Sequence, residues 1–154
     1  MDWIDSKQVK LILREFDCLD KALLTQISEI LEEIQSNTEE FQVGFKGLNV
    51  TPNWKRPREL WIGFDQKSKK KLNKLSDNLN EKLIQRKIAS NSQSTFHPQL
   101  TIAKWNDVPT PYLNHNFIKE FCFYYLDVFP SFAFNQILIT KIDQNGEEIL
   151  YTSK

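Results

Sequence analysis

Two long helical patterns, each flanked by short alternating segments, constrain the fold of this 154-residue chain most strongly. Apolar residues recur at helical spacing between the N-cap candidate Asp20 and Asn37, and again from residue 68 to residue 88. The two apolar stripes are Leu23, Ile27, Ile30, Leu31, Ile34 and Leu72, Leu75, Leu79, Leu83. Alternating segments predict strands at residues 9–13, 41–45, 59–64 and 99–101, and a closing hairpin of residues 133–142 and 148–152. This order predicts one α+β domain, residues 1–154, with helices covering one side of antiparallel sheets.

Composition excludes several classes of function. Apolar residues make up 40% of the chain, while 20 basic and 20 acidic residues give a net charge of zero. Without a global field for polyanions, any phosphate affinity must come from local clusters. Cys18 and Cys122 lack metal or redox spacing, and with two histidines we expect no metal and no cofactor. No apolar run approaches the ~20 residues of a membrane span, and no signal peptide is evident, so we predict a cytoplasmic protein without membrane association.

The segment Phe-His-Pro-Gln-Leu-Thr-Ile-Ala-Lys-Trp, residues 96–105, carries the most specific pattern. Pro98 forces an extended conformation on His97, and a short strand follows from Gln99. Side chains two apart on a strand share a face. We therefore expect Gln99 and Thr101 to point the same way.

This segment resembles the second signature of the 2H phosphoesterases, the family of 2′-5′ RNA ligase-like RNA 2′,3′-cyclic phosphodiesterases. That signature runs aromatic, any residue, Pro, His, aliphatic, Thr, aliphatic, Ala, basic residue, and Gln99 stands where the catalytic His belongs. The family's first signature, His-x-Thr, falls on Lys10-Leu11-Ile12, and the 89 positions from Lys10 to Gln99 are similar to the family spacing. Residues 56–63, Arg-Pro-Arg-Glu-Leu-Trp-Ile-Gly, also resemble a family strand. The resemblance implies a bilobal fold in which two antiparallel sheets flank a central cleft, with helices on the outer sides.

The resemblance implies a mechanism that this chain lacks the groups to perform. In the family, one His takes a proton from water, the other protonates the leaving ribose oxygen, and two Thr hydroxyls hold the phosphate. Gln99 can only hydrogen-bond, Ile12 has no hydroxyl, and a lysine such as Lys10 is a poor general base. We therefore predict a non-catalytic protein that binds a phosphorylated ligand, either an RNA end or a nucleotide. The candidate ligand-binding residues are Lys10, Arg14, Arg58, His97, Gln99, Thr101 and Lys104.

Two alternatives remain open on the sequence. The site could be rewired for cyclic phosphodiesterase activity, with Lys10 and His97 replacing the histidine pair. The fold could instead serve as a protein-interaction scaffold. The family usually begins with a further strand and helix, so we read the domain as N-terminally short. An exposed sheet edge would then need a cover, and we expect a homodimer, a partner subunit or a rearranged segment there.

Overall fold

The computed structural model describes residues 2–16, 20–54, 56–88, 96–105, 131–134, 136–143 and 146–152. The elements in chain order are β1 (Asp2–Trp3), the 3₁₀ helix η1 (Ser6–Gln8), α1 (Lys21–Ser36), β2 (Phe41–Val43), β3 (Phe45–Thr51), β4 (Glu59–Phe64), α2 (Gln66–Gln85), β5 (Gln99–Lys104), β6 (Phe132–Phe134), β7 (Leu138–Asp143) and β8 (Gly146–Thr152). The pairs β1–β5, β5–β4, β4–β3 and β7–β8 are antiparallel. The predicted α+β class is confirmed.

The chain divides into two compact units. The first comprises Met1–Ile12, Val43–Lys71 and His97–Phe132, and the second comprises Leu13–Gln42, Leu72–Phe96 and Ala133–Lys154. Helix α2 contributes to both, because the division falls between Lys71 and Leu72. Neither described helix combines the length and the apolar character needed to cross a bilayer.

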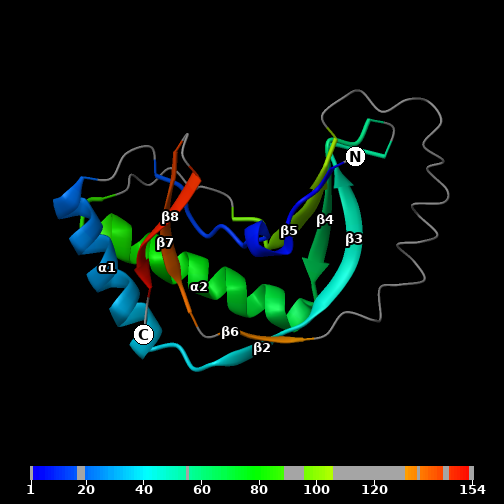
Figure 1. Ribbon diagram of the computed structural model, residues 1–154. Helices are drawn as coiled ribbons and strands as arrows, with labels where there is room; N and C mark the ends of the chain where they lie inside the picture. The colour runs from blue at the N-terminus through cyan, green and yellow to red at the C-terminus, as the bar shows by residue number, and fades with distance from the viewer. Residues whose placement is uncertain are drawn as a thin grey trace. The chain divides into compact units, whose positions relative to one another are not determined.

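The first unit contains a four-stranded sheet in the order β1-β5-β4-β3 (Figure 1). As the alternation predicted, Leu60, Ile62 and Phe64 of β4 are buried. A compact apolar cluster lies on this sheet and consists of Val50, Leu60, Ala103 and Trp105.

Two glycines shape the start of β3. Gly47 has a φ of +89° and lies where the register of β3 against β4 shifts. That conformation favours glycine because an L side chain is strained there. Gly44 separates β2 from β3, and its carbonyl accepts a hydrogen bond from the Asp65 backbone N–H at 2.9 Å. A Cβ at Gly44 would overlap the Asp65 carboxylate, so this is a close approach of backbone to side chain.

The second unit packs α1, part of α2 and the β7–β8 hairpin around one core. Both predicted apolar stripes contribute to it, and the Asp20 side chain caps α1 by accepting from the Leu23 N–H at 2.7 Å. The β7–β8 hairpin confirms the predicted closing hairpin. Its first arm begins at Leu138 and not at residue 133, because Phe132–Phe134 forms the separate strand β6, which pairs with β2. The buried core residues are Ile27, Ile30, Leu31, Ile34, Leu75, Leu79, Leu83, Ile137 and Ile139.

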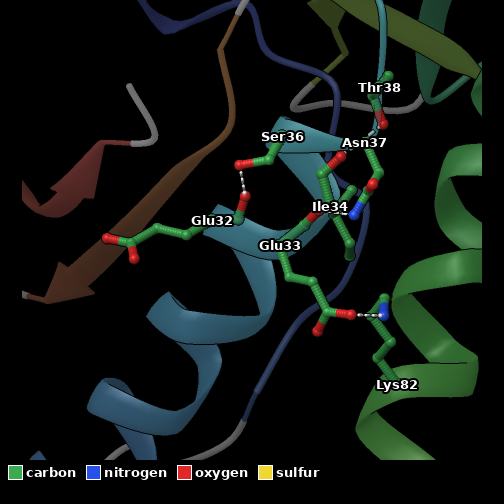
Figure 2. Close-up of polar contacts among 7 residues, drawn as sticks. All are labelled: Glu32, Glu33, Ile34, Ser36, Asn37, Thr38 and Lys82. Carbon is green, nitrogen blue, oxygen red and sulfur yellow. Dashed lines mark hydrogen bonds and ion pairs between the residues drawn. The ribbon is translucent and has the colours of Figure 1, made fainter.

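The C-terminal end of α1 is closed by side chains that bond to its last carbonyl oxygens (Figure 2). The donors and acceptors are Ser36 Oγ to Glu32 O at 2.8 Å, Asn37 Nδ2 to Glu33 O at 2.7 Å and Thr38 Oγ1 to Ile34 O at 2.7 Å. The carbonyls of Glu33 and Ile34 are among the last four of α1, which lack partners within the helix, so the Asn37 and Thr38 side chains satisfy groups that the helix leaves open. Lys82 Nζ of α2 also donates to Glu33 Oε1 at 2.5 Å, and this hydrogen bond lowers the pKa of Glu33.

The strand predicted at residues 9–13 is wrong, because those residues adopt no regular secondary structure. Its residues are divided between the two units: the N-terminal segment of the first unit ends at Ile12, and Leu13 packs against the core of the second. Ile12 itself is 50% exposed. The strand predicted at 41–45 is likewise two strands, β2 and β3. Cys18 and Cys122 lie outside the described residues.

Candidate functional site

Strands β4 and β5 bring predicted site residues onto one face of the first unit's sheet. Gln99 pairs with Gly63, Thr101 with Trp61 and Lys104 with Glu59. Because directly opposed residues of an antiparallel pair project to the same face, the three side chains share that face. We call it the polar face; its members are Asn49, Thr51, Glu59, Trp61, Gly63, Gln99, Thr101 and Lys104.

A bulge in β5 places Lys104 on the polar face. Leu60 pairs with Ala103 and Trp61 with Thr101, so Ile102 is an extra residue on β5. Strict alternation would put Thr101 and Lys104 on opposite faces, since they are three residues apart. The extra residue reverses the alternation after Thr101. No residue type in this stretch signals the bulge, so pattern reasoning could not have located it.

Lys104 already has an acidic neighbour. Its Nζ lies 3.6 Å from Glu59 Oε1, and both side chains are partly open to solvent. Surface pairs of this kind are weak, so the pair can exchange for a phosphate. The charge that Lys104 offers an anion is nevertheless partly offset by Glu59.

The connection before β4 is held by backbone hydrogen bonds. The Arg58 N–H donates to the Thr51 carbonyl at 2.7 Å, and the Arg58 carbonyl accepts from the Trp105 N–H at 2.9 Å. The Arg58 side chain is exposed. A fixed backbone with an exposed guanidinium suits an anion-binding role beside β4.

Trp61 is a member of the polar face that sequence reasoning left unassigned. Its indole is half-buried, and its Nε1 donates to Thr51 Oγ1 at 2.9 Å. A signal was available, because the buried positions Leu60 and Ile62 force Trp61 onto the opposite face of β4. A large aromatic residue at the outward position of an alternating strand marks a candidate contact residue.

The remaining predicted residues are placed as follows. His97 is exposed and precedes β5 directly, in the segment that ends at Pro98. Lys10 belongs to the same compact unit as the polar face and is half-buried. Arg14 belongs to the second unit, where its Nη1 donates to Asn80 Oδ1 of α2 at 3.3 Å. The structure therefore brings Gln99, Thr101 and Lys104 together, while ligand contacts by the others stay predictions.

Metal chemistry has no visible support within the described ranges. They hold no group of three or more His, Cys, Asp and Glu side chains arranged to bind an ion. The polar face offers amide, hydroxyl, indole and ammonium groups, with the single carboxylate of Glu59 paired to Lys104. Such groups recognise a ligand by hydrogen bonding and stacking.

The fold defines the class of protein first. The solved structure of TT0787 of Thermus thermophilus matches 99% of this chain and 80% of its own chain, with a TM-score of 0.67. At 13% sequence identity this likeness concerns the fold alone. The described part of the chain shares that fold, which combines α-helices with antiparallel sheets.

The sequence then defines the family. The model of the AKAP7 2′5′ RNA ligase-like domain matches residues 12–152, and the chain belongs to this family. The chain is also 28% identical over 102 residues to an RNA 2′,3′-cyclic phosphodiesterase of Aquifex aeolicus (strain VF5). That alignment covers 66% of this chain and 54% of the relative, so the chain spans about half the length of the curated relative it matches.

The signature positions depart from the family pattern despite this membership. The second signature retains Thr101 and carries Gln99 at the histidine position, and the first reads Lys10-Leu11-Ile12. The family match begins at Ile12, two residues after Lys10. The family is therefore shown by the body of the chain, and the departures fall on the positions to which the sequence resemblance assigned proton transfer and phosphate binding.

Proposed function

We propose that this protein binds a phosphorylated ligand, an RNA end or a nucleotide, on the polar face around Thr101 without hydrolysing it. The observation that supports this most directly is the pairing of Gln99 with Gly63 and of Thr101 with Trp61. It places a carboxamide and a hydroxyl side by side on one face of β5. Both groups can donate hydrogen bonds to phosphate oxygens.

The same two side chains argue against turnover. General acid and base groups are each worth about 10²–10⁴ in rate, and their pKa must lie near the working pH. A carboxamide and an aliphatic hydroxyl do not titrate in that range. Ile12 adds no polar group at the first signature, and its side chain is 50% exposed. These replacements therefore remove the titrating groups that catalysis needs but leave hydrogen-bond donors that can bind a phosphate.

Positive charge is available but modest on this face. Lys104 is paired with Glu59, while Arg58 is exposed at the start of β4. A chain of zero net charge provides no long-range attraction. We therefore expect recognition of one terminal phosphate or one nucleotide, with little dependence on the length of an RNA.

Calorimetry and a product assay test the proposal. Adenosine 2′,3′-cyclic phosphate and adenosine 2′-monophosphate serve as probes, because a relative is named RNA 2′,3′-cyclic phosphodiesterase. We expect both to bind and the cyclic phosphate to remain closed. Thr101→Val should weaken binding by roughly 10- to 150-fold, the equivalent of one hydrogen bond to a charged group. Thr25→Val, at an exposed threonine of α1, is the matched control.

Other outcomes would favour the alternatives. Ring opening that Lys10→Ala abolishes would establish a rewired phosphodiesterase and refute the non-catalytic proposal. Absence of binding by every phosphorylated probe would refute the ligand proposal and favour a scaffold.

A covering partner at the sheet edge remains a separate proposal. Strand β1 has two residues beside β5, and its Trp3 is 63% exposed. Short edge strands with exposed aromatic groups are suited to further pairing. Light scattering at micromolar concentration should give a mass above that of one chain, and a monomer would exclude the homodimer.

A further inference from the structure

The indole of Trp61 extends along β4 over the polar face. Its Nε1 donates to Thr51 Oγ1 at 2.9 Å, and Thr51 is paired with Glu59, two residues before Trp61. In the opposite direction its Cζ3 lies 3.5 Å from the position that a Cβ on Gly63 would occupy. The two ends of the ring therefore reach toward neighbouring rows of the sheet. These contacts direct the long axis of the indole along β4, and the half-buried ring keeps part of its surface open to a ligand.

Gly63 makes room for the indole and for the backbone of β3. A Cβ there would stand 2.9 Å from the carbonyl oxygen of Lys46, which is closer than such contacts tolerate. Gly63 has no side chain to rise beside the ring, and its pairing partner is Gln99. Gly63 is itself buried, and the carbonyl oxygens of Lys46 and Gly47 lie near the position of its missing Cβ, so this end of the indole packs beside the backbone of β3.

The neighbours of Trp61 across the sheet are polar. Asn49 of β3 and Thr101 of β5 are its direct partners on either side. Directly opposed residues have Cβ atoms about 4.5–5.5 Å apart, so a phosphate held by the Thr101 hydroxyl would lie beside the indole. The ring lies between two polar residues, and its N–H is already satisfied by Thr51.

We propose that Trp61 is the base-stacking residue of this site, and that it holds the nucleobase of a nucleotide whose phosphate lies at Thr101. This inference rests on the proposed function and assigns it a recognition element. Every nucleobase has a π face, and stacking on an aromatic side chain is worth about 1–3 kcal/mol per base. Anchoring the indole in advance reduces the entropy lost when the base binds. The occupant is therefore a nucleotide or an RNA end, and a base-free phosphate should bind more weakly.

The test compares adenosine 5′-monophosphate with ribose 5-phosphate, which has the same phosphate and sugar without the base. Calorimetry on the wild-type protein should give tighter binding of the nucleotide by roughly 5- to 150-fold. Trp61→Leu should remove that advantage and leave the affinity for ribose 5-phosphate unchanged. Trp61→Phe should retain much of it, because a phenyl ring still stacks.

Two further variants separate stacking from support of the fold. Trp3→Leu removes an indole from the opposite face of the same sheet and should change neither affinity. Thr51→Val keeps the ring of Trp61 but removes the acceptor of its N–H. It should lower the affinity for the nucleotide alone, by a smaller factor than Trp61→Leu does. Binding of the nucleotide should also quench the part of the tryptophan emission that Trp61→Leu abolishes.

The outcomes distinguish this inference from the proposed function. If the wild-type protein binds neither probe, both fail. If it binds both probes and Trp61→Leu retains the preference for the nucleotide, the stacking inference alone is wrong. Trp61→Leu could instead lower the affinity for both probes equally, and Thr51→Val could do the same. That result would mean that Trp61 only stabilises the sheet, and it would also overturn the inference.

Discussion

Asp65 links the first unit's sheet to α2, and replacing it tests how that junction is held. Its Oδ1 accepts from the Ser68 N–H at 2.7 Å, in the position of an N-cap for α2. Its own N–H donates to the Gly44 carbonyl at 2.9 Å, and the Gly44 N–H donates to Ser68 Oγ at 2.9 Å. Asp65 therefore caps the helix and shares the contacts that fix the break between β2 and β3.

The expected cost of Asp65→Ala follows from these contacts. Loss of an N-cap side chain costs about 0.5–2 kcal/mol, and loss of a negative charge at a helix N-terminus adds about 0.3–1 kcal/mol. We expect the free energy of unfolding at pH 7 to fall by roughly 1–2.5 kcal/mol. Asp65→Asn keeps an oxygen acceptor and should lose less. Urea denaturation followed by circular dichroism measures both.

The pH dependence provides an independent check. The hydrogen bond from the Ser68 backbone N–H, with further donors and the charge of Lys67, holds the pKa of Asp65 below its ordinary value. The carboxylate is thus favoured in the folded state, and its contribution is present above the unfolded pKa of about 3.9. It is lost as the pH falls through the folded pKa. The gap in stability between wild type and Asp65→Asn should therefore narrow below about pH 4.

Asp20→Ala is the matched control, because Asp20 caps α1 through the same kind of bond, from the Leu23 N–H at 2.7 Å. It should cost about 0.5–2 kcal/mol from the cap alone. The reasoning about Asp65 would be refuted if the free energy of unfolding of Asp65→Ala lay within about 0.3 kcal/mol of the wild-type value, because that difference is below the range for a lost cap. A wild-type-to-Asp65→Asn gap that stayed constant from pH 7 to pH 3 would refute the account of its charge.

Three further predictions concern packing, backbone space and an ion pair. Ile34→Ala, at a residue with 0% exposure, should cost about 2–5 kcal/mol in urea denaturation; Ile84→Ala, 39% exposed, should cost much less, and equal losses would contradict the assigned core. Gly63→Ala should destabilise by about 1–3 kcal/mol, because its Cβ would press on a strand carbonyl; an unchanged midpoint would count against that contact. Lys82→Met should raise the pKa of Glu33 toward its ordinary value in an NMR titration, and an unshifted titration would show that the pair does not persist in solution.

The helices were predictable because each is specified by one periodic signal. The stripes of α1 and α2 alternate with polar residues over several turns, and Asp20 supplies an N-cap where the first pattern begins. Strand β4 was predicted at its observed limits for a similar reason, since Leu60, Ile62 and Phe64 alternate along the strand and are all buried. A pattern predicts an element well when all its apolar residues are buried against the same surface.

Pattern reasoning fails where neighbouring residues belong to different compact units, or where the register between two paired strands shifts. Residues 9–13 alternate, but Leu13 packs on the second unit while the preceding residues belong to the first. The extra residue Ile102 in β5 depends on how β5 pairs with β4, which is a property of two strands together. For the candidate site, the sequence predicted that Gln99 and Thr101 share a face and named Lys104 as a further candidate, but it did not predict the bulge that turns Lys104 to the same face.

Family membership and chemistry are specified by different features of this chain. Backbone hydrogen bonds to β4 fix where the side chains of residues 99 and 101 begin and which face they occupy. They do so whatever side chain is present, because a β-ladder uses only backbone groups. Proton transfer, in contrast, depends on the atoms at the end of the side chain. A family match over residues 12–152 therefore supports the direction in which the side chains of Gln99 and Thr101 point. The identity of residue 99, a glutamine, decides which chemistry is possible at that position. A product assay therefore tests function here, and a further likeness in fold does not.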